Sequence, residues 1–133
     1  MTVGRFVASA HSQNMTGYQQ RIRLGDHLLV ADEPVSLGGQ NAGPPPYGFV
    51  LGGLAACTAM TLEMYATRKG WTLGPVKVDL SLFDEGVSHR IERKIMFGHP
   101  MSAEQRARLL DIAEKTPVTK FLKRSATIVT TLA

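Results

Sequence analysis

The sequence lacks a second cysteine. Cys57 is the only one among 133 residues, so one copy of the chain cannot form an internal disulfide. A thiol without a partner has two interpretations: it packs like a small hydrophobic residue, or it serves as a reactive centre. The presence of Cys57 does not decide between these interpretations, so the residues around it have to be considered.

The sequence also lacks long apolar runs. None reaches the roughly 18 uninterrupted residues of a membrane span, and the first residues, MTVGRFVASAHSQ, have no continuous apolar core of the signal-peptide type. We therefore expect no membrane partner and a cytoplasmic location, where a single cysteine stays reduced. Repeats and low-complexity tracts are absent too, and the length fits one domain, so we expect a single domain over residues 1–133.

Charge of one sign is not concentrated anywhere in the sequence. The formal net charge is +4, but the basic residues are scattered in RIR, TRKG, HRIERK and FLKRS. No zinc-finger spacing, aromatic RNA-binding motif or long basic run accompanies them, so we predict no nucleic-acid partner. The four histidines show no metal-ligand spacing, and the sequence implies no metal or other cofactor.

The first half of the chain is predicted to form strands followed by one long helix. The segments YQQRIRL and HLLVADEP are typical of strands joined by a Gly-Asp turn, and Arg21 and Arg23 would share one face of the first. The proline-rich loop LGGQNAGPPPYG then leads into a helix over residues 47–69. Gly52 and Gly53 reduce the stability of that helix. Their usual compensation is close approach of another backbone, so we expect the helix to be deeply buried.

The second half is predicted to form a hairpin, two helices and a final strand. Apolar and polar residues alternate over 76–82, and the returning strand HRIERKIMFG places Arg93 on its apolar face, which the pattern leaves unexplained. Ser102 and Gln105 form a capping box at the start of one helix, and Thr116 followed by proline starts another. The β-branched segment SATIVTTLA predicts a closing strand. This order of elements predicts an α+β domain.

Several of these motifs, in this order, resemble the OsmC/Ohr family (osmotically inducible protein C and organic hydroperoxide resistance protein). The resemblance rests on GPPPYGFVLGGLAACTAMTLEMYATRKGW, HLLVADEP, IERKI, SAEQRARLLDIAEK and TPV, and it covers roughly residues 17–133. It implies an α+β subunit that intertwines with a second copy, with antiparallel sheets around long central helices buried at the centre of a homodimer. Tight packing of those helices would account for the two glycines.

The resemblance also implies a chemistry. Characterised members of the family are thiol peroxidases that reduce organic hydroperoxides. One cysteine on the central helix attacks the peroxide. A second, in a Cys-Pro-Val motif, forms a disulfide with the oxidised first cysteine, and dithiols supply the reducing equivalents. An arginine from the N-terminal sheet and a glutamate at the start of the central helix assist. Cys57 falls at the attacking position, and Arg21 or Arg23 is the candidate for the arginine.

The chain departs from the family pattern at two positions. Thr116 stands where the family has its second cysteine, and Gly48 stands where it has the glutamate, for which Asp32 or Glu33 is an alternative source. We therefore expect a one-cysteine peroxidase in oxidative-stress defence, whose sulfenic acid is reduced by an external thiol or dithiol. The alternative is a degenerate member that binds a small apolar or acidic ligand in the interface cleft without turning it over.

Overall fold

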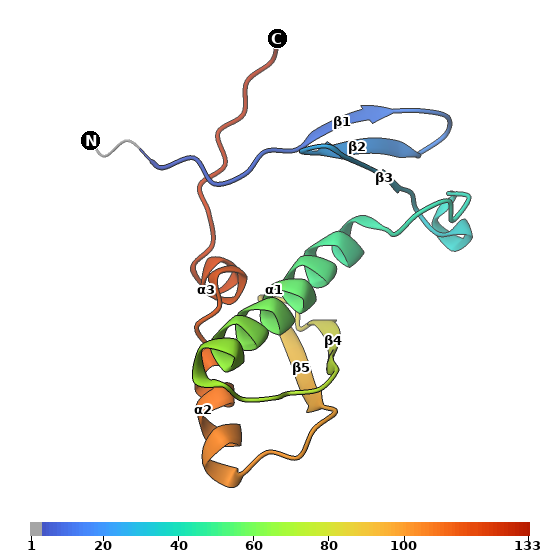
Figure 1. Ribbon diagram of the computed structural model, residues 1–133. Coiled ribbons are helices and arrows are strands. Elements are labelled where there is room, and N and C mark those ends of the chain that lie inside the picture. The colour runs from blue at the N-terminus through green and yellow to red at the C-terminus, as the bar shows by residue number, and fades with distance from the viewer. Residues whose placement is uncertain (1–3) are drawn as a thin grey trace. The chain divides into compact units, whose positions relative to one another are not determined.

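The computed structural model describes residues 4–133, which divide into two compact units near residue 50 (Figure 1). The division falls within the first turns of the long helix α1 (Pro46–Lys69). We describe each unit by itself, and the single domain expected for residues 1–133 stays a prediction.

The first unit contains a three-stranded antiparallel sheet in the order β1-β2-β3. The two strands expected from YQQRIRL and HLLVADEP are confirmed, with the Gly-Asp turn between them. A short 3-10 helix, η1, follows the sheet. The bounds are β1 (His11–Asn14), β2 (Gln20–Leu24), β3 (His27–Ala31) and η1 (Val35–Leu37).

Asp32, buried directly after β3, organises the loop that leads to α1. Its carboxylate accepts hydrogen bonds from the backbone N–H groups of Glu33, Gln40 and Ala42 at 2.8, 3.0 and 3.1 Å. These bonds, that of Ala42 foremost, hold the pKa of the Asp32 carboxyl below its usual range against the opposing effect of burial. Gly39 passes so close to the Glu33 carbonyl that a side chain has no room there. A buried carboxylate therefore fixes the shape of this loop.

The second unit combines a hairpin with helices that share one core. In β4 one face is half-buried and the other exposed, which confirms the predicted alternation. The fully buried cluster draws on α1, the segment after it and α2: Leu62, Ala66, Leu73, Leu109 and Ala113. The remaining elements are β4 (Val76–Asp84), β5 (His89–Phe97), α2 (Ala103–Ala113) and α3 (Pro117–Arg124).

The predicted starts of the last two helices are confirmed. The Ser102 side chain accepts a hydrogen bond from the Gln105 N–H, and the Gln105 side chain accepts one from the Ser102 N–H, which completes the capping box of α2. Thr116 caps α3 by accepting from the Thr119 N–H at 3.2 Å. These caps satisfy backbone donors that a helix leaves unpaired at its first turn.

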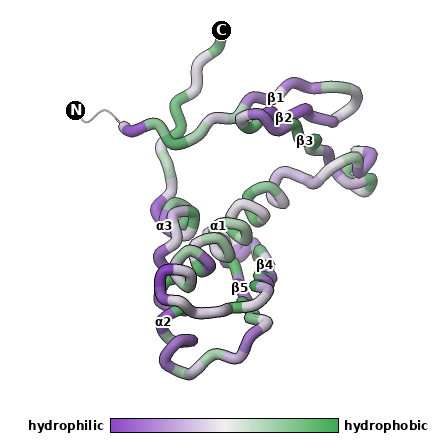
Figure 2. Tube along the Cα trace, viewed as in Figure 1, coloured by the Kyte–Doolittle hydropathy of each residue, from purple (hydrophilic) through white to green (hydrophobic). Residues whose placement is uncertain are grey.

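The burial of α1 is one-sided in the single chain. Only one stripe of the helix is buried, at Leu54, Thr58, Leu62 and Ala66, every fourth residue. Nothing lies within 4 Å of the position that a Cβ would take at Gly53. In the single chain, hairpin and helices cover one face of α1 alone. The expected deep burial depends on a second helix at the centre of a homodimer, so it stays a prediction. Within residues 4–133, α1 is the one helix long and apolar enough to cross a membrane, a test that the core helices of soluble proteins also pass (Figure 2).

The predicted C-terminal strand is wrong for the single chain. Residues 125–133 are exposed, and they pair with no strand in the described part of the chain. Ile128 and Val129 are 86% and 84% exposed, in a segment with hydrophobic stretches (Figure 2). Strand propensity is realised only where a neighbouring strand supplies hydrogen bonds and a packing surface, and here none does.

Candidate functional site

Cys57 lies on α1 at the edge of its buried stripe. Its side chain points about 100° away from that of the next residue, the buried Thr58, because each helical residue turns by that angle. The thiol is half-buried, and its Sγ lies 3.9 Å from Thr61 Oγ1, its one hydrogen-bond contact within residues 4–133. Cys57 is therefore accessible rather than enclosed in the core of the unit.

Arg21 and Arg23 lie on β2, in the first unit. They share a face of the strand, as predicted, opposite Val30 and Leu28 of β3. Both are exposed, and in the described part of the chain neither guanidinium has a hydrogen-bond or ion-pair partner. Because Cys57 belongs to the other unit, the approach of either arginine to the thiol stays a prediction.

Gly48, where the resemblance places the family's glutamate, lies in the first turn of α1. A Cβ there would lie 3.5 Å from Pro44 Cβ and 3.6 Å from Pro45 Cδ, which is ordinary contact, so packing in the chain does not require glycine. Asp32 is a poor substitute for the missing carboxylate because three loop amides already engage its oxygens. Glu33 remains as the alternative source.

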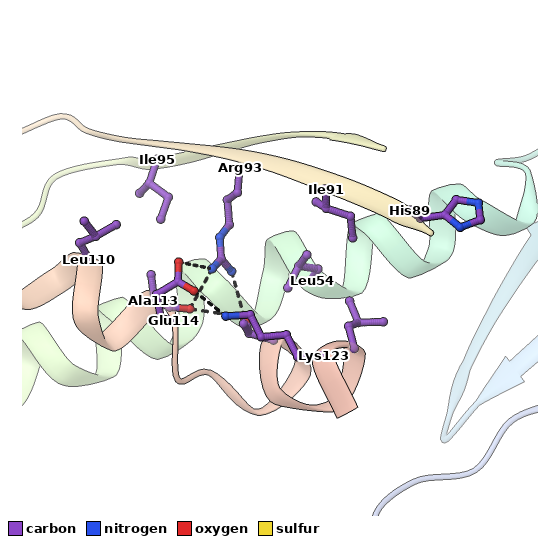
Figure 3. Close-up of a pocket in the computed structure, with 11 residues that line it drawn as sticks. Leu54, His89, Ile91, Arg93, Ile95, Leu110, Ala113, Glu114 and Lys123 are labelled. Carbon is purple, nitrogen blue, oxygen red and sulfur yellow. Dashed lines mark hydrogen bonds and ion pairs between the residues drawn. The ribbon is translucent and has the colours of Figure 1, made fainter. Parts of the chain in front are cut away.

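Arg93 occupies a place that the sequence pattern left unexplained. Its side chain is 12% exposed and extends from the apolar face of β5. Nη1 donates to Thr58 Oγ1 and Thr119 Oγ1 at 2.9 Å each, and Nη2 donates to the Ala113 carbonyl at 3.0 Å (Figure 3). The guanidinium thus binds the carboxyl-terminal end of α2 and joins it to α1 and α3, where a cation is favoured. The available signal was the single charge on an otherwise apolar strand face.

Thr116, where the resemblance places the family's second cysteine, is fully buried in the same network. Its Oγ1 lies 2.6 Å from Thr119 Oγ1, which accepts a hydrogen bond from Arg93, and Arg93 donates in turn to Thr58. Hydrogen bonds therefore connect the position of the second thiol to the residue beside Cys57. A hydroxyl cannot form a disulfide, so this chain uses the position for structure.

A cavity of about 500 Å³ opens beside Arg93, between α1, β5, α2 and α3 (Figure 3). Cys57 does not line it. Arg93 extends into the region between two isoleucines of β5, toward the end of α2. The apolar walls are Leu54, Ile91, Ile95, Leu110 and Leu122.

Three charged side chains border this cavity: Arg93, Glu114 and Lys123. Lys123 Nζ lies 2.7 Å from Glu114 Oε2, whereas Arg93 Nη2 lies 3.7 Å from Glu114 Oε1. The hydrogen bond from Lys123 is the main reason that the pKa of Glu114 lies below its usual range. Burial of the carboxyl acts in the opposite direction. Two cations therefore face one carboxylate. No group of three or more His, Cys, Asp or Glu side chains within residues 4–133 is arranged to hold a metal ion.

A family model described as an OsmC-like protein matches residues 38–131 of the chain. The chain belongs to this OsmC-like family. The match includes Cys57, Gly48 and Thr116, and it confirms the family that the motifs indicated. No curated protein matches the chain.

Solved structures with the fold of this OsmC-like protein come from several bacteria. An OsmC-like protein from Mycoplasma pneumoniae is 16% identical, with a TM-score of 0.76 and coverage of 89% of this chain and 88% of that one. The organic hydroperoxide resistance protein OsmC from Legionella pneumophila is 18% identical, with a TM-score of 0.64 over 89% and 90%. The organic hydroperoxide resistance protein OhrB of Bacillus subtilis is 22% identical, with a TM-score of 0.59 over 86% and 89%. These similarities confirm the α+β fold.

Proposed function

We propose that this OsmC-like protein is a thiol-dependent peroxidase of the one-cysteine type, which reduces organic hydroperoxides or related peroxides in oxidative-stress defence. The observation that carries the proposal is the accessible thiol of Cys57 on α1, inside the segment that matches the family. Two proteins of similar fold are described as organic hydroperoxide resistance proteins, which supports the substrate class.

The proposed reaction needs no second cysteine. The Cys57 thiolate attacks the outer peroxide oxygen, so that an S–O bond forms as the O–O bond breaks. The alkoxide takes a proton and leaves as an alcohol, while the sulfur is oxidised to a sulfenic acid. An external thiolate then attacks that sulfur, releasing water and forming a mixed disulfide. A second external thiol displaces Cys57 as thiolate, so the net reductant is a pair of thiols or one dithiol.

Arg21 or Arg23 supplies the cation that this reaction requires. A neighbouring positive charge favours a thiolate over a thiol, and N–H donors stabilise the negative charge that develops on the leaving oxygen. The two side chains share one face of β2, and no other side chain of residues 4–133 engages their guanidinium groups. Both are therefore free to serve in this role.

We include a second copy of the chain among the partners. Gly53, Cys57, Met60 and Met64 recur at the four-and-three spacing of a single helical face, and the two methionines are 60% and 59% exposed. A homodimer would cover this face of α1 beside the thiol. The setting that we propose is the cytoplasm, where reducing thiols are available.

The test of this function is the consumption of an organic hydroperoxide in the presence of a dithiol. Cys57→Ser should abolish turnover, because the serine hydroxyl is not a comparable nucleophile at neutral pH. Ala56→Ser, at the exposed neighbouring position, is the matched control and should retain the wild-type rate. After exposure to the peroxide, a sulfenic-acid-specific reagent should label the wild-type protein and Ala56→Ser. It should not label Cys57→Ser. Equal turnover in wild type and Cys57→Ser would end the enzyme proposal and leave the ligand-binding alternative.

The same assay distinguishes the two arginines. Replacing the arginine that donates to the leaving oxygen by alanine should lower kcat/KM about a hundredfold, the usual cost of one such donor. The substitution of the other, on the same strand face, should change the rate by less than about threefold. If Arg21→Ala and Arg23→Ala both retain wild-type rates, neither residue is part of the machinery.

A further inference from the structure

We propose that the cavity beside Arg93 binds a carboxylic acid with an apolar chain, which would lie on the apolar walls with its carboxylate between Arg93 and Lys123. Cys57 does not line this cavity, and the acid carries no peroxide bond. The proposal therefore stands independently of the thiol chemistry.

The size and the walls of the cavity fit a small amphiphilic molecule. Its volume of about 500 Å³ lies within the range of small-molecule sites, which are mostly apolar with a few placed polar groups. Leu54, Ile91 and Leu122 bring apolar side chains from three different elements to the walls. Leu110, which also borders the cavity, is 62% exposed although it is a large apolar residue on a folded helix. A hydrocarbon chain in the cavity would cover these surfaces.

The hydrogen bonds of Arg93 leave donors for a carboxylate. A guanidinium has five N–H groups, and three of them donate to Thr58, Thr119 and Ala113, so two remain. Glu114 does not take them by hydrogen bonding, because its Oε1 is 3.7 Å from Arg93 and its Oε2 is engaged by Lys123 at 2.7 Å. A carboxylate is the acceptor that matches two parallel N–H donors of an arginine.

The balance of charge selects an anion. Arg93 and Lys123 together carry two positive charges against the single negative charge of Glu114, so the cavity has a net positive charge. A cationic amphiphile of the same length would be repelled, and a neutral alcohol would gain the walls without the charge-assisted hydrogen bonds. Chain and head group therefore make separate, measurable contributions to affinity.

Isothermal titration calorimetry of the full chain with octanoate, decanoate, decanol and decylammonium, below their micellar concentrations, tests the proposal. We expect saturable binding of one acid per chain, about fifteenfold tighter for decanoate than for octanoate, because each of the two additional buried methylenes adds roughly fourfold. Decanol should bind at least about tenfold more weakly than decanoate, and decylammonium should show no saturable binding.

Variants of α3 locate the site. Lys123→Met should weaken decanoate about fivefold and leave decanol unchanged. Lys120→Met is the matched control, since Lys120 is exposed on the same helix and does not line the cavity. Leu122→Trp should fill the cavity and abolish binding, with circular dichroism confirming the fold. Ile91→Phe is a second filling variant in case Leu122→Trp does not fold.

Three results would each overturn the proposal. One is the absence of saturable decanoate binding up to millimolar concentration, which would mean that a second copy or another part of the chain fills the cavity. Another is equal affinity for decanol and decanoate. The third is an equal effect of Lys120→Met and Lys123→Met, which would place the acid on the surface of α3 instead.

Discussion

The two sides of α1 differ in how well packing within a single chain accounts for their residues. On the inner side, Leu54, Thr58, Leu62 and Ala66 are at most 4% exposed, and the last two belong to the core of the second unit. On the outer side, Met60 and Met64 are 60% and 59% exposed, and the glycine of that side, Gly53, has nothing near it. Cys57 lies at the edge of the outer side.

The difference indicates that the two sides satisfy different requirements. The inner side includes one polar residue, Thr58, and Arg93 supplies its partner, so the buried polar groups are fully paired. The outer side combines a half-buried thiol with a glycine and two methionines that the hairpin and the other helices leave exposed. Packing within the chain therefore accounts for the inner residues, and the second copy that we propose would account for the outer ones.

The largest expected effect belongs to the inner side. Arg93→Met should lower the free energy of unfolding by about 3 kcal/mol, because it removes the shared donor of Thr58, Thr119 and Ala113 in a buried setting. Urea denaturation followed by circular dichroism, at one protein concentration, measures this loss.

Arg90→Met is the matched control for that loss. Arg90 lies on the same strand, but its side chain is 46% exposed and its partners are the exposed Glu85 and Glu92 and the ring of the exposed Phe83. Exposed ion pairs contribute little, so we expect a change below about 1 kcal/mol. Similar losses for Arg90→Met and Arg93→Met would contradict the assignment of Arg93 as the link between α1, α2 and α3.

An intermediate effect is expected on the outer side. Met64→Lys should weaken self-association at least about tenfold, because an ammonium group would be buried twice in a symmetric interface. Val87→Lys is the control, since Val87 is fully exposed in the hairpin turn and belongs to no such face. Sedimentation measurements across a range of protein concentrations give the dissociation constants. A monomeric wild-type protein at micromolar concentration would refute the proposed homodimer.

The sequence predicted the elements whose signals are local. The capping residues Ser102 and Thr116 start α2 and α3 where expected, and period-two alternation placed β4 and its hairpin. The helix expected over 47–69 is observed at Pro46–Lys69. Each of these signals depends on neighbours in the chain, which is why a single sequence is sufficient for it.

The properties that depend on distant residues could not be predicted in this way. Arg93 was an unexplained charge because Thr119 and Ala113, its partners, lie 26 and 20 positions away. The segment 125–133 has the propensity of a strand, but a strand also needs a neighbour, and no local pattern reports one. The choice between Arg21 and Arg23 could not be predicted for the same reason. Both side chains are exposed on the same face of β2, so no local property separates them.

The smallest expected effect is the most direct probe of the outer side of α1, because its sign depends on what covers that side. In a single chain, Gly53→Ala should raise the free energy of unfolding by about 0.5–1 kcal/mol, since alanine favours the helix and nothing within 4 Å opposes its Cβ. If the backbone of a second copy approaches at Gly53, the same methyl group meets that backbone and the substitution destabilises the dimer instead. Thermal denaturation at two protein concentrations separates these outcomes, with Ala55→Ser as a control that leaves the glycine in place. A stabilisation that is independent of concentration would show that no backbone approaches Gly53, and tight helix packing would then not explain why α1 carries this glycine.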